Sequence, residues 1–158
     1  MSDYEALLAQ IQHEEDTIQF TAFTNDMAID LGLRLVQAAR EAKQSVTVDI
    51  CRHGHQLFHC ALPGTTADND EWIQRKNRVV ARFGHSSYYM GIQLRSLDTT
   101  IDAKYLLDPA VYAPHGGAFP ITVKDVGVVG TVTVSGLPQE EDHRLVVRVL
   151  REFLGLPG

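Results

Sequence analysis

The chain has 158 residues, a length typical of one domain, which we assign to residues 1–158. Its net charge of −6 disfavours nonspecific binding to nucleic acid or to an anionic membrane surface, because the long-range field repels polyanions. It holds two cysteines without metal-ligand spacing, no apolar stretch long enough to cross a membrane and no secretory signal, so we expect a cytoplasmic protein with free thiols.

The first half of the sequence mixes helical and strand-like apolar spacing. Ser2 and Glu5 form a capping-box pattern, which predicts that a helix begins there. Residues 18–22 alternate between apolar and polar side chains, the pattern of a half-buried strand. Gly54, between two histidines, supplies the positive φ that a tight hairpin turn requires. We therefore expect helices over 2–15 and 25–43, and strands over 18–22, 46–50 and 56–62.

The second half predicts three more helices and two more strands. One face of the helix that precedes Gly84 carries Trp72 and Lys76 together with apolar residues. Pro138 suits the first turn of the last helix. Residues 98–118 show no clear pattern, and long connections of this kind often carry function. We expect helices over 68–83, 86–95 and 139–154, and strands over 119–123 and 128–134.

Direct links between neighbouring strands indicate the fold class. Strands follow one another at 50–58 and 123–128 through turns too short for a helical crossover, and only antiparallel pairing allows this. Five strands, two hairpins and several helices therefore predict an α+β fold, in which a five-stranded antiparallel sheet is flanked by helices.

The run H-G-G-A-F-P-I in the last third of the chain is the first candidate binding segment. Gly116 and Gly117 would let backbone N–H groups approach a ligand, because no Cβ stands in the way. His115 adds a ring that can ligate a metal or accept a proton near neutral pH. Pro120, next to Phe119, fixes the backbone at the start of a strand. The alternative is a glycine turn beside an edge strand, without a ligand.

Two further segments are candidates for binding an anion. Ser135 and Gly136 precede the last predicted helix, whose amino end favours negative charge, although acidic residues already occupy its first turn. The run does not match a nucleotide-binding fingerprint. Arg75 and Arg78 lie on one face of the helix over 68–83 and could hold carboxylates. The alternative for these arginines is a solvated face that pairs with nearby acids.

Three histidines, His53, His55 and His59, lie in or near the predicted hairpin. Residues two apart share a face of a strand, but the turn at Gly54 separates the first two histidines. No cysteine or carboxylate completes a known zinc spacing. We therefore expect structural or surface roles for these histidines and no metal site. Nothing in the sequence orders a serine, a histidine and an aspartate into a catalytic triad.

Four sequence motifs resemble one known family. They are W-I-Q-R-K at 72–76, H-S-S-Y at 85–88, G-G-A-F-P-I at 116–121 and G-T-V-T-V-S-G-L at 130–137. Together they are similar to the HbpS-like, GlcG-related family often called the haem-degrading domain, and in particular to its compact cytosolic UPF0303-like branch. The resemblance implies a five-stranded profilin-like or GlcG-like sheet and assembly into homo-oligomers. For some relatives it also implies haem binding and redox-linked haem breakdown, with His115 as the candidate axial ligand.

These observations leave three functions open. The first is a small-molecule-binding protein for haem, another tetrapyrrole or a carboxylate, with haem degradation as its enzymatic form. The second is a non-catalytic oligomeric scaffold or adaptor, in which exposed aromatics such as Tyr88, Tyr89 and Tyr112 serve subunit contacts. The third is a hydrolase or isomerase acting on an organic acid, with His115 or Asp125 as base. A pocket that holds His115 together with basic side chains would favour ligand binding.

Overall fold

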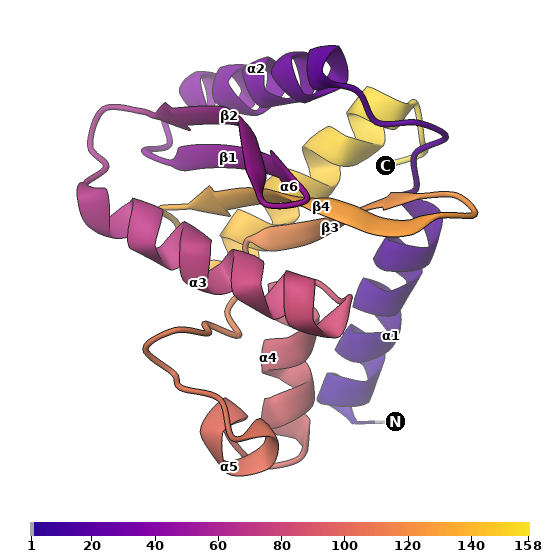
Figure 1. Ribbon diagram of the computed structural model, residues 1–158, viewed down its shortest axis with the longest axis vertical. Helices are drawn as coiled ribbons and strands as arrows, with labels where there is room; N and C mark the ends of the chain where they lie inside the picture. Colours follow the sequence, from indigo (N-terminus) through magenta and orange to yellow (C-terminus); the bar gives the residue numbers. More distant parts are fainter. Residues whose placement is uncertain (1) are drawn as a thin grey trace.

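The computed structural model describes residues 2–158 (Figure 1). Its helices are α1 (Asp3–Thr17), α2 (Asn25–Glu41), α3 (Ala67–Phe83), α4 (Ser87–Ser96), α5 (Ile101–Tyr105) and α6 (Gln139–Leu154). Its strands are β1 (Thr47–Arg52), β2 (His55–Ala61), β3 (Ala118–Val123) and β4 (Gly127–Ser135). Apart from the strand over 18–22, every expected helix and strand is present within two residues of its expected bounds, and α5 is additional. Within residues 2–158, no helix has the length and apolar character needed to cross a membrane.

The sheet has four strands in the antiparallel order β2-β1-β4-β3, so the prediction of five strands is wrong. α1 continues to Thr17 and Thr24 caps α2, so residues 18–23 serve as the connection between these two helices. Only Phe20 reaches the sheet. Its N–H donates to Thr122 O (2.8 Å), and Lys124 N–H donates to Phe20 O (2.9 Å). The alternation over 18–22 therefore reflects burial in the core rather than strand pairing.

One face of the sheet is apolar and carries the main core. Val48 and Ile50 of β1 face this side, because successive residues of a strand point to opposite faces. Val132 and Val134 of β4 join them, and α2 and α6 cover them. Burial of this apolar surface is the main stabilising contribution to the fold and holds both helices on the same side of the sheet.

The opposite face of the sheet is polar and lies beneath α3. Asp49 and Cys51 of β1 face this side, next to Thr131 and Thr133 of β4. Figure 1 shows α3 crossing the sheet on the side away from α2. Polar side chains between a sheet and a helix must find hydrogen-bond partners, since buried polar groups without partners are costly. The fold therefore places a row of polar groups where α3 can reach them.

The β1–β2 hairpin turn has the geometry that the sequence predicts. His53 has φ 50° and Gly54 has φ 78°, and positive φ at both central residues defines a type I′ turn. The turn projects His53 from the end of β1 next to β4, where His53 N–H donates to Val129 O (2.9 Å).

A smaller apolar cluster joins α3 to α4 and α5. Its buried members are Val79, Met90, Leu94 and Ile101. Tyr89 and Tyr112, which we expected to be exposed, lie half-buried against this cluster, and Tyr88 is half-buried beside His143. These tyrosines therefore stabilise the monomer.

Candidate functional site

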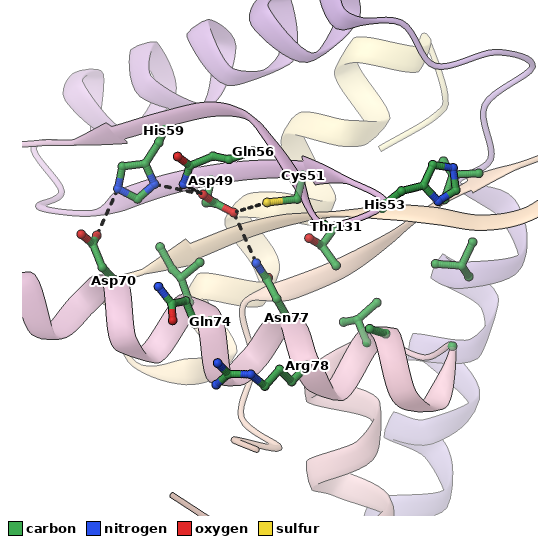
Figure 2. A pocket seen from close by; sticks show the side chains of 18 residues that line it. Asp49, Cys51, His53, Gln56, His59, Asp70, Gln74, Asn77, Arg78 and Thr131 are labelled. Carbon is green, nitrogen blue, oxygen red and sulfur yellow. Dashed lines mark hydrogen bonds and ion pairs between the residues drawn. The ribbon is translucent and has the colours of Figure 1, made fainter. Parts of the chain in front are cut away.

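A cavity lies between α3 and the polar face of the sheet (Figure 2). We call it the α3 cleft. Its volume of about 780 Å³ lies within the range of roughly 300–1,000 Å³ that is typical of small-molecule sites. Polar side chains line the end nearer the start of α3, and apolar side chains line the end nearer Gly84.

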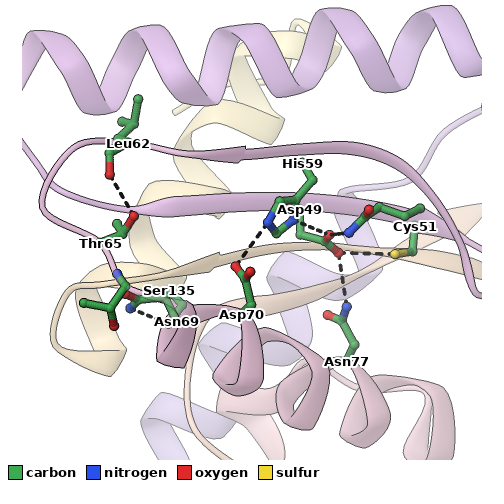
Figure 3. A network of polar contacts seen from close by, with 11 residues as sticks. Asp49, Cys51, His59, Leu62, Thr65, Asn69, Asp70, Asn77 and Ser135 are labelled. Carbon is green, nitrogen blue, oxygen red and sulfur yellow. Dashed lines mark hydrogen bonds and ion pairs between the residues drawn. The ribbon is translucent and has the colours of Figure 1, made fainter.

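Asp49 is the centre of the polar end and is 2% exposed (Figure 3). Its Oδ1 accepts a hydrogen bond from Gln56 Nε2 (2.8 Å) and lies 3.0 Å from His59 Nδ1. Its Oδ2 accepts hydrogen bonds from Asn77 Nδ2 (3.3 Å) and from Cys51 Sγ (3.2 Å). These partners satisfy a buried carboxylate that would otherwise be costly to remove from water.

The register of the sheet explains why these side chains converge. Asp49 lies directly opposite His59 on β2 and opposite Thr133 on β4. Thr133 Oγ1 donates a hydrogen bond to Asn77 Oδ1, while the amide of Asn77 donates to Asp49. The network therefore links α3 to three strands, β1, β2 and β4, and forms the floor of the α3 cleft.

Neither His59 nor Cys51 is available as a metal ligand. His59 directs Nδ1 at Asp49 and lies with Nε2 3.1 Å from Asp70 Oδ1, so both ring nitrogens are engaged. Burial, together with the charge of Asp49 and the hydrogen bond to it, raises the pKa of Cys51 to about 12. Its sulfur therefore stays a thiol at neutral pH. Within residues 2–158, no group of three or more His, Cys, Asp or Glu side chains is placed to hold a metal ion.

The apolar end of the α3 cleft contains one histidine. His53 lines it from the hairpin turn, and its ring has no hydrogen-bond partner in the described part of the chain. Val80 and Val128 line the same end. Arg78 lines the cleft from α3, where its guanidinium points toward Gln74 and away from His53 and donates one hydrogen bond, to Val111 O (3.3 Å).

A second cavity of about 320 Å³ lies at the segment that the sequence singles out, and we call it the His115 pocket. It brings together three predicted site residues, His115, Ser135 and Gly136. Its other lining residues were not among the predicted site residues, and they include Trp72, Lys76 and Asp142.

Lys76 and Asp142 form a buried ion pair at the base of the His115 pocket. They are 3% and 1% exposed, and Lys76 Nζ lies 3.1 Å from Asp142 Oδ2. Nζ also donates to Val134 O (3.3 Å), and Leu137 N–H donates to Asp142 Oδ1 (3.0 Å). Burial lowers the pKa of Lys76 and raises that of Asp142 to about 6, and the attraction between the two charges opposes both shifts.

His115 lies half-buried above this ion pair, with its ring edge-on to Trp72 at 5.7 Å between centroids. Burial lowers the pKa of His115, and the positive charges of Arg95, Lys76 and Arg75 lower it further. The ring is therefore neutral at physiological pH, so it can donate one hydrogen bond and accept one.

Gly116 and Gly117 allow close packing around the ion pair. A Cβ at Gly117, where φ is 139°, would lie 2.4 Å from Val134 O and 2.7 Å from Lys76 Nζ. A Cβ at Gly116 would lie 2.2 Å from Gln139 O. The close backbone approach predicted for these glycines is present, and its partners in the structure are protein groups.

The remaining predicted residues lie apart from the His115 pocket. Phe119 and Pro120 are buried residues of β3, and neither lines one of the two cavities. The guanidinium of Arg75 stacks on the Trp72 ring at 4.5 Å and donates to Pro109 O (2.7 Å), which anchors the connection between α5 and β3. The other predicted arginine lies in the α3 cleft instead. The predicted site is therefore divided between two cavities.

Lys76 had a usable signal in the sequence. It lies on the apolar face of its helix beside Trp72, and a charged residue on such a face requires a buried partner. The sequence gives no such signal for Asp142, because an acidic residue in a first helical turn also complements the helix dipole. Asp49 was recognisable as a polar position on a strand, but most of its partners come from two other elements, β2 and α3.

Comparison with known proteins shows the family. Residues 23–151 match the model of a family described as haem degrading protein HbpS-like. The chain belongs to the HbpS-like family. A UPF0303 protein of Streptomyces coelicolor is 55% identical to this HbpS-like chain over 148 residues, which cover 94% of each chain. The resemblance that the four sequence motifs indicate is therefore confirmed.

Two solved structures are similar to the HbpS-like chain. The crystal structure of Ybr137w has a TM-score of 0.89 and 36% identity, and the match covers 98% of this chain and 97% of that one. A crystal structure of PduOC in complex with haem has a TM-score of 0.69 and 16% identity, and the match covers 86% of this chain and 97% of that one. The second likeness shows a common fold.

Proposed function

We propose that this HbpS-like protein binds a small molecule in the α3 cleft and that this molecule is haem. The observation that supports the proposal is a cavity of about 780 Å³ with an apolar end that includes a histidine with an unpaired ring among the described residues. A family described as haem degrading, and a haem complex of PduOC with the same fold, point to the same ligand.

The His115 pocket does not fit haem. Its volume of about 320 Å³ is near the lower limit of small-molecule sites, and its base is occupied by the ion pair of Lys76 and Asp142. A macrocycle needs a broad apolar slot, which this small and polar pocket lacks. We therefore do not place haem beside His115, although the sequence makes this residue the first candidate for an axial ligand.

The α3 cleft offers the groups that would hold haem. His53 would offer an imidazole nitrogen to the iron, and Val80 and Val128 would offer apolar surface to the macrocycle. Arg78, which lines the same cleft, would suit a propionate, because a guanidinium binds a carboxylate through two hydrogen bonds.

Haem breakdown is the enzymatic activity that this proposal adds to haem binding. Bound haem supplies one-electron and oxygen chemistry at its iron, while the protein sets ligation and local polarity. Cys51 stays protonated, and both nitrogens of His59 are engaged, so neither competes with His53 for the iron. The network at Asp49 keeps the floor of the cleft rigid beneath the ligand.

Titration with haem, followed by absorbance at the Soret band, tests the proposal. We expect saturable, stoichiometric binding that His53→Ala weakens and shifts in wavelength, while His55→Ala, a change in the same turn, leaves it unaltered. Binding that is lost in His115→Ala but kept in His53→Ala would contradict the placement. Absence of saturable binding would refute haem as the ligand. Loss of Soret absorbance with oxygen and ascorbate tests breakdown separately.

A second proposal concerns assembly of this chain into a homo-oligomer, which a scaffold or adaptor function would require. β2 is an edge strand, and an edge presents unpaired backbone groups that can join another chain. Ile29 and Leu33, one turn apart on α2, are 45% and 55% exposed. We propose that these features form a contact between copies of this chain. Light scattering after gel filtration should show a homo-oligomer that Leu33→Asp dissociates, and a monomeric wild type would contradict the proposal.

A further inference from the structure

The His115 pocket contains a buried amine that is not fully paired. Lys76 carries three N–H groups when protonated, and two acceptors lie within hydrogen-bond distance of its Nζ, Asp142 Oδ2 at 3.1 Å and Val134 O at 3.3 Å. The third N–H has no acceptor within residues 2–158. The residue is 3% exposed and lines the pocket, so a molecule in the pocket is the natural partner for that N–H.

Other donors face the same space. Ser135 is 3% exposed, and its oxygen accepts a hydrogen bond from Asn69 Nδ2 (3.3 Å), so its own O–H is free to donate. The indole N–H of Trp72 has no acceptor in the described part of the chain, and Trp72 lines the pocket. In contrast, both oxygens of Asp142 are already used, by Lys76 and by Leu137 N–H. The pocket therefore offers more donors than acceptors.

The charges around the pocket limit which acceptor it can hold. Lys76 and Asp142 offset each other, Arg75 and Arg95 contribute positive charge at His115, and Glu140 and Glu141 lie exposed in the first turn of α6. Charges of both signs thus surround the pocket, and their near balance suits a single negative charge better than the double charge of a phosphate. Trp72 supplies a flat apolar wall for the organic part of a ligand.

We infer that the His115 pocket binds the carboxylate of a small organic acid, with Lys76 and Ser135 as hydrogen-bond donors and Trp72 against the carbon chain. The cavity of about 320 Å³ is near the lower limit of small-molecule sites, which suits a small acid. Gly117 makes this site possible, because a Cβ there would lie 2.7 Å from the amine of Lys76. The site is separate from the α3 cleft and does not depend on haem binding.

The fluorescence of Trp72 reports on this pocket directly, because it is the only tryptophan in the chain. Purified protein is titrated with sodium acetate at constant ionic strength, which is held with sodium chloride. Acetamide serves as a neutral molecule of the same shape, and inorganic phosphate serves as a doubly charged anion. We expect a saturable change in Trp72 emission with acetate, a much weaker one with acetamide, and weaker binding of phosphate than of acetate.

Variants separate this site from the α3 cleft. Ser135→Ala should weaken acetate binding by about tenfold, because a hydrogen bond to a charged group is lost. Lys76→Met should abolish binding if the variant folds, and Ser135→Ala decides the matter if it does not. His53→Ala should leave acetate binding unchanged. No saturable change with acetate, an equal response to acetamide, tighter binding of phosphate, or unaltered binding in Ser135→Ala would each overturn the inference.

Discussion

Replacing Lys76 with methionine removes one half of an ion pair that the fold buries almost completely. Lys76 and Asp142 are 3% and 1% exposed, and their charged atoms lie 3.1 Å apart. Breaking a buried pair by removing one partner typically costs about 3–5 kcal/mol, because the other charge stays buried without compensation. We expect Lys76→Met to lower the free energy of unfolding by that amount at pH 8.

The loss of stability in Lys76→Met should depend on pH, because Asp142 changes its charge in the accessible pH range. Its pKa rises from an ordinary 3.8 to about 6 in the folded protein, mainly because burial disfavours the charged form. Stability that comes from the protonated carboxyl is therefore fully present below pH 3.8 and is lost as the pH rises through about 6. The difference between these two pKa values corresponds to about 3 kcal/mol, at about 1.36 kcal/mol for each pH unit.

In Lys76→Met the carboxyl of Asp142 loses its cation, so its pKa rises further. At pH 5 this carboxyl is protonated, and the variant should lose less than about 1 kcal/mol, the net value of a typical hydrogen bond. Urea denaturation at pH 5 and pH 8, followed by far-UV circular dichroism at equal protein concentration, measures both values. The double variant Lys76→Met/Asp142→Leu should stay within about 2 kcal/mol of the wild type at both pH values. If Lys76→Met loses the same free energy of unfolding at pH 5 and at pH 8, the proposed dependence on the charge of Asp142 is wrong.

Two further predictions test the packing and the thiol. Gly117→Ala should destabilise the protein by about 2 kcal/mol more than Gly127→Ala in the same urea assay, since a Cβ at Gly117 meets Val134 O at 2.4 Å, whereas at Gly127 it meets nothing within 4 Å and only the positive φ is strained. Equal losses would show that the backbone relaxes freely at Gly117. Iodoacetamide should label Cys51 very slowly in the folded protein at pH 8, because a pKa of about 12 leaves roughly one thiolate in ten thousand. Asp49→Asn should accelerate this labelling by lowering the pKa, and labelling of the wild type as fast as in urea would contradict the assignment.

The sequence predicts the elements of this fold well, because most carry two signals that agree. The last helix has Pro138 before it and an apolar stripe along it, and its expected bounds match those of α6. The segment over 18–22 carried only alternation, which burial alone can produce. In the structure this segment pairs with the sheet at one position, Phe20 beside Val123, and alternation does not show how many residues of a segment lie against a sheet edge.

The candidate site was predictable only where neighbours in sequence stay neighbours in space. His115, Ser135 and Gly136 meet because β3 pairs with β4 and because the glycines permit close approach. The ion pair joins residues 66 positions apart, and no local pattern shows which lysine lies against which aspartate. The α3 cleft was missed because its histidine lies in a hairpin turn, a place where exposed residues are common.

We propose that haem binds at the apolar end of the α3 cleft. The most direct test is to locate the iron itself, by anomalous X-ray scattering from crystals of the protein grown with haem. We predict a single strong iron peak within bonding distance of a His53 ring nitrogen. An iron peak beside His115, or elsewhere in the molecule, would contradict the placement, and crystals without ordered iron in the cleft would argue against haem as the ligand.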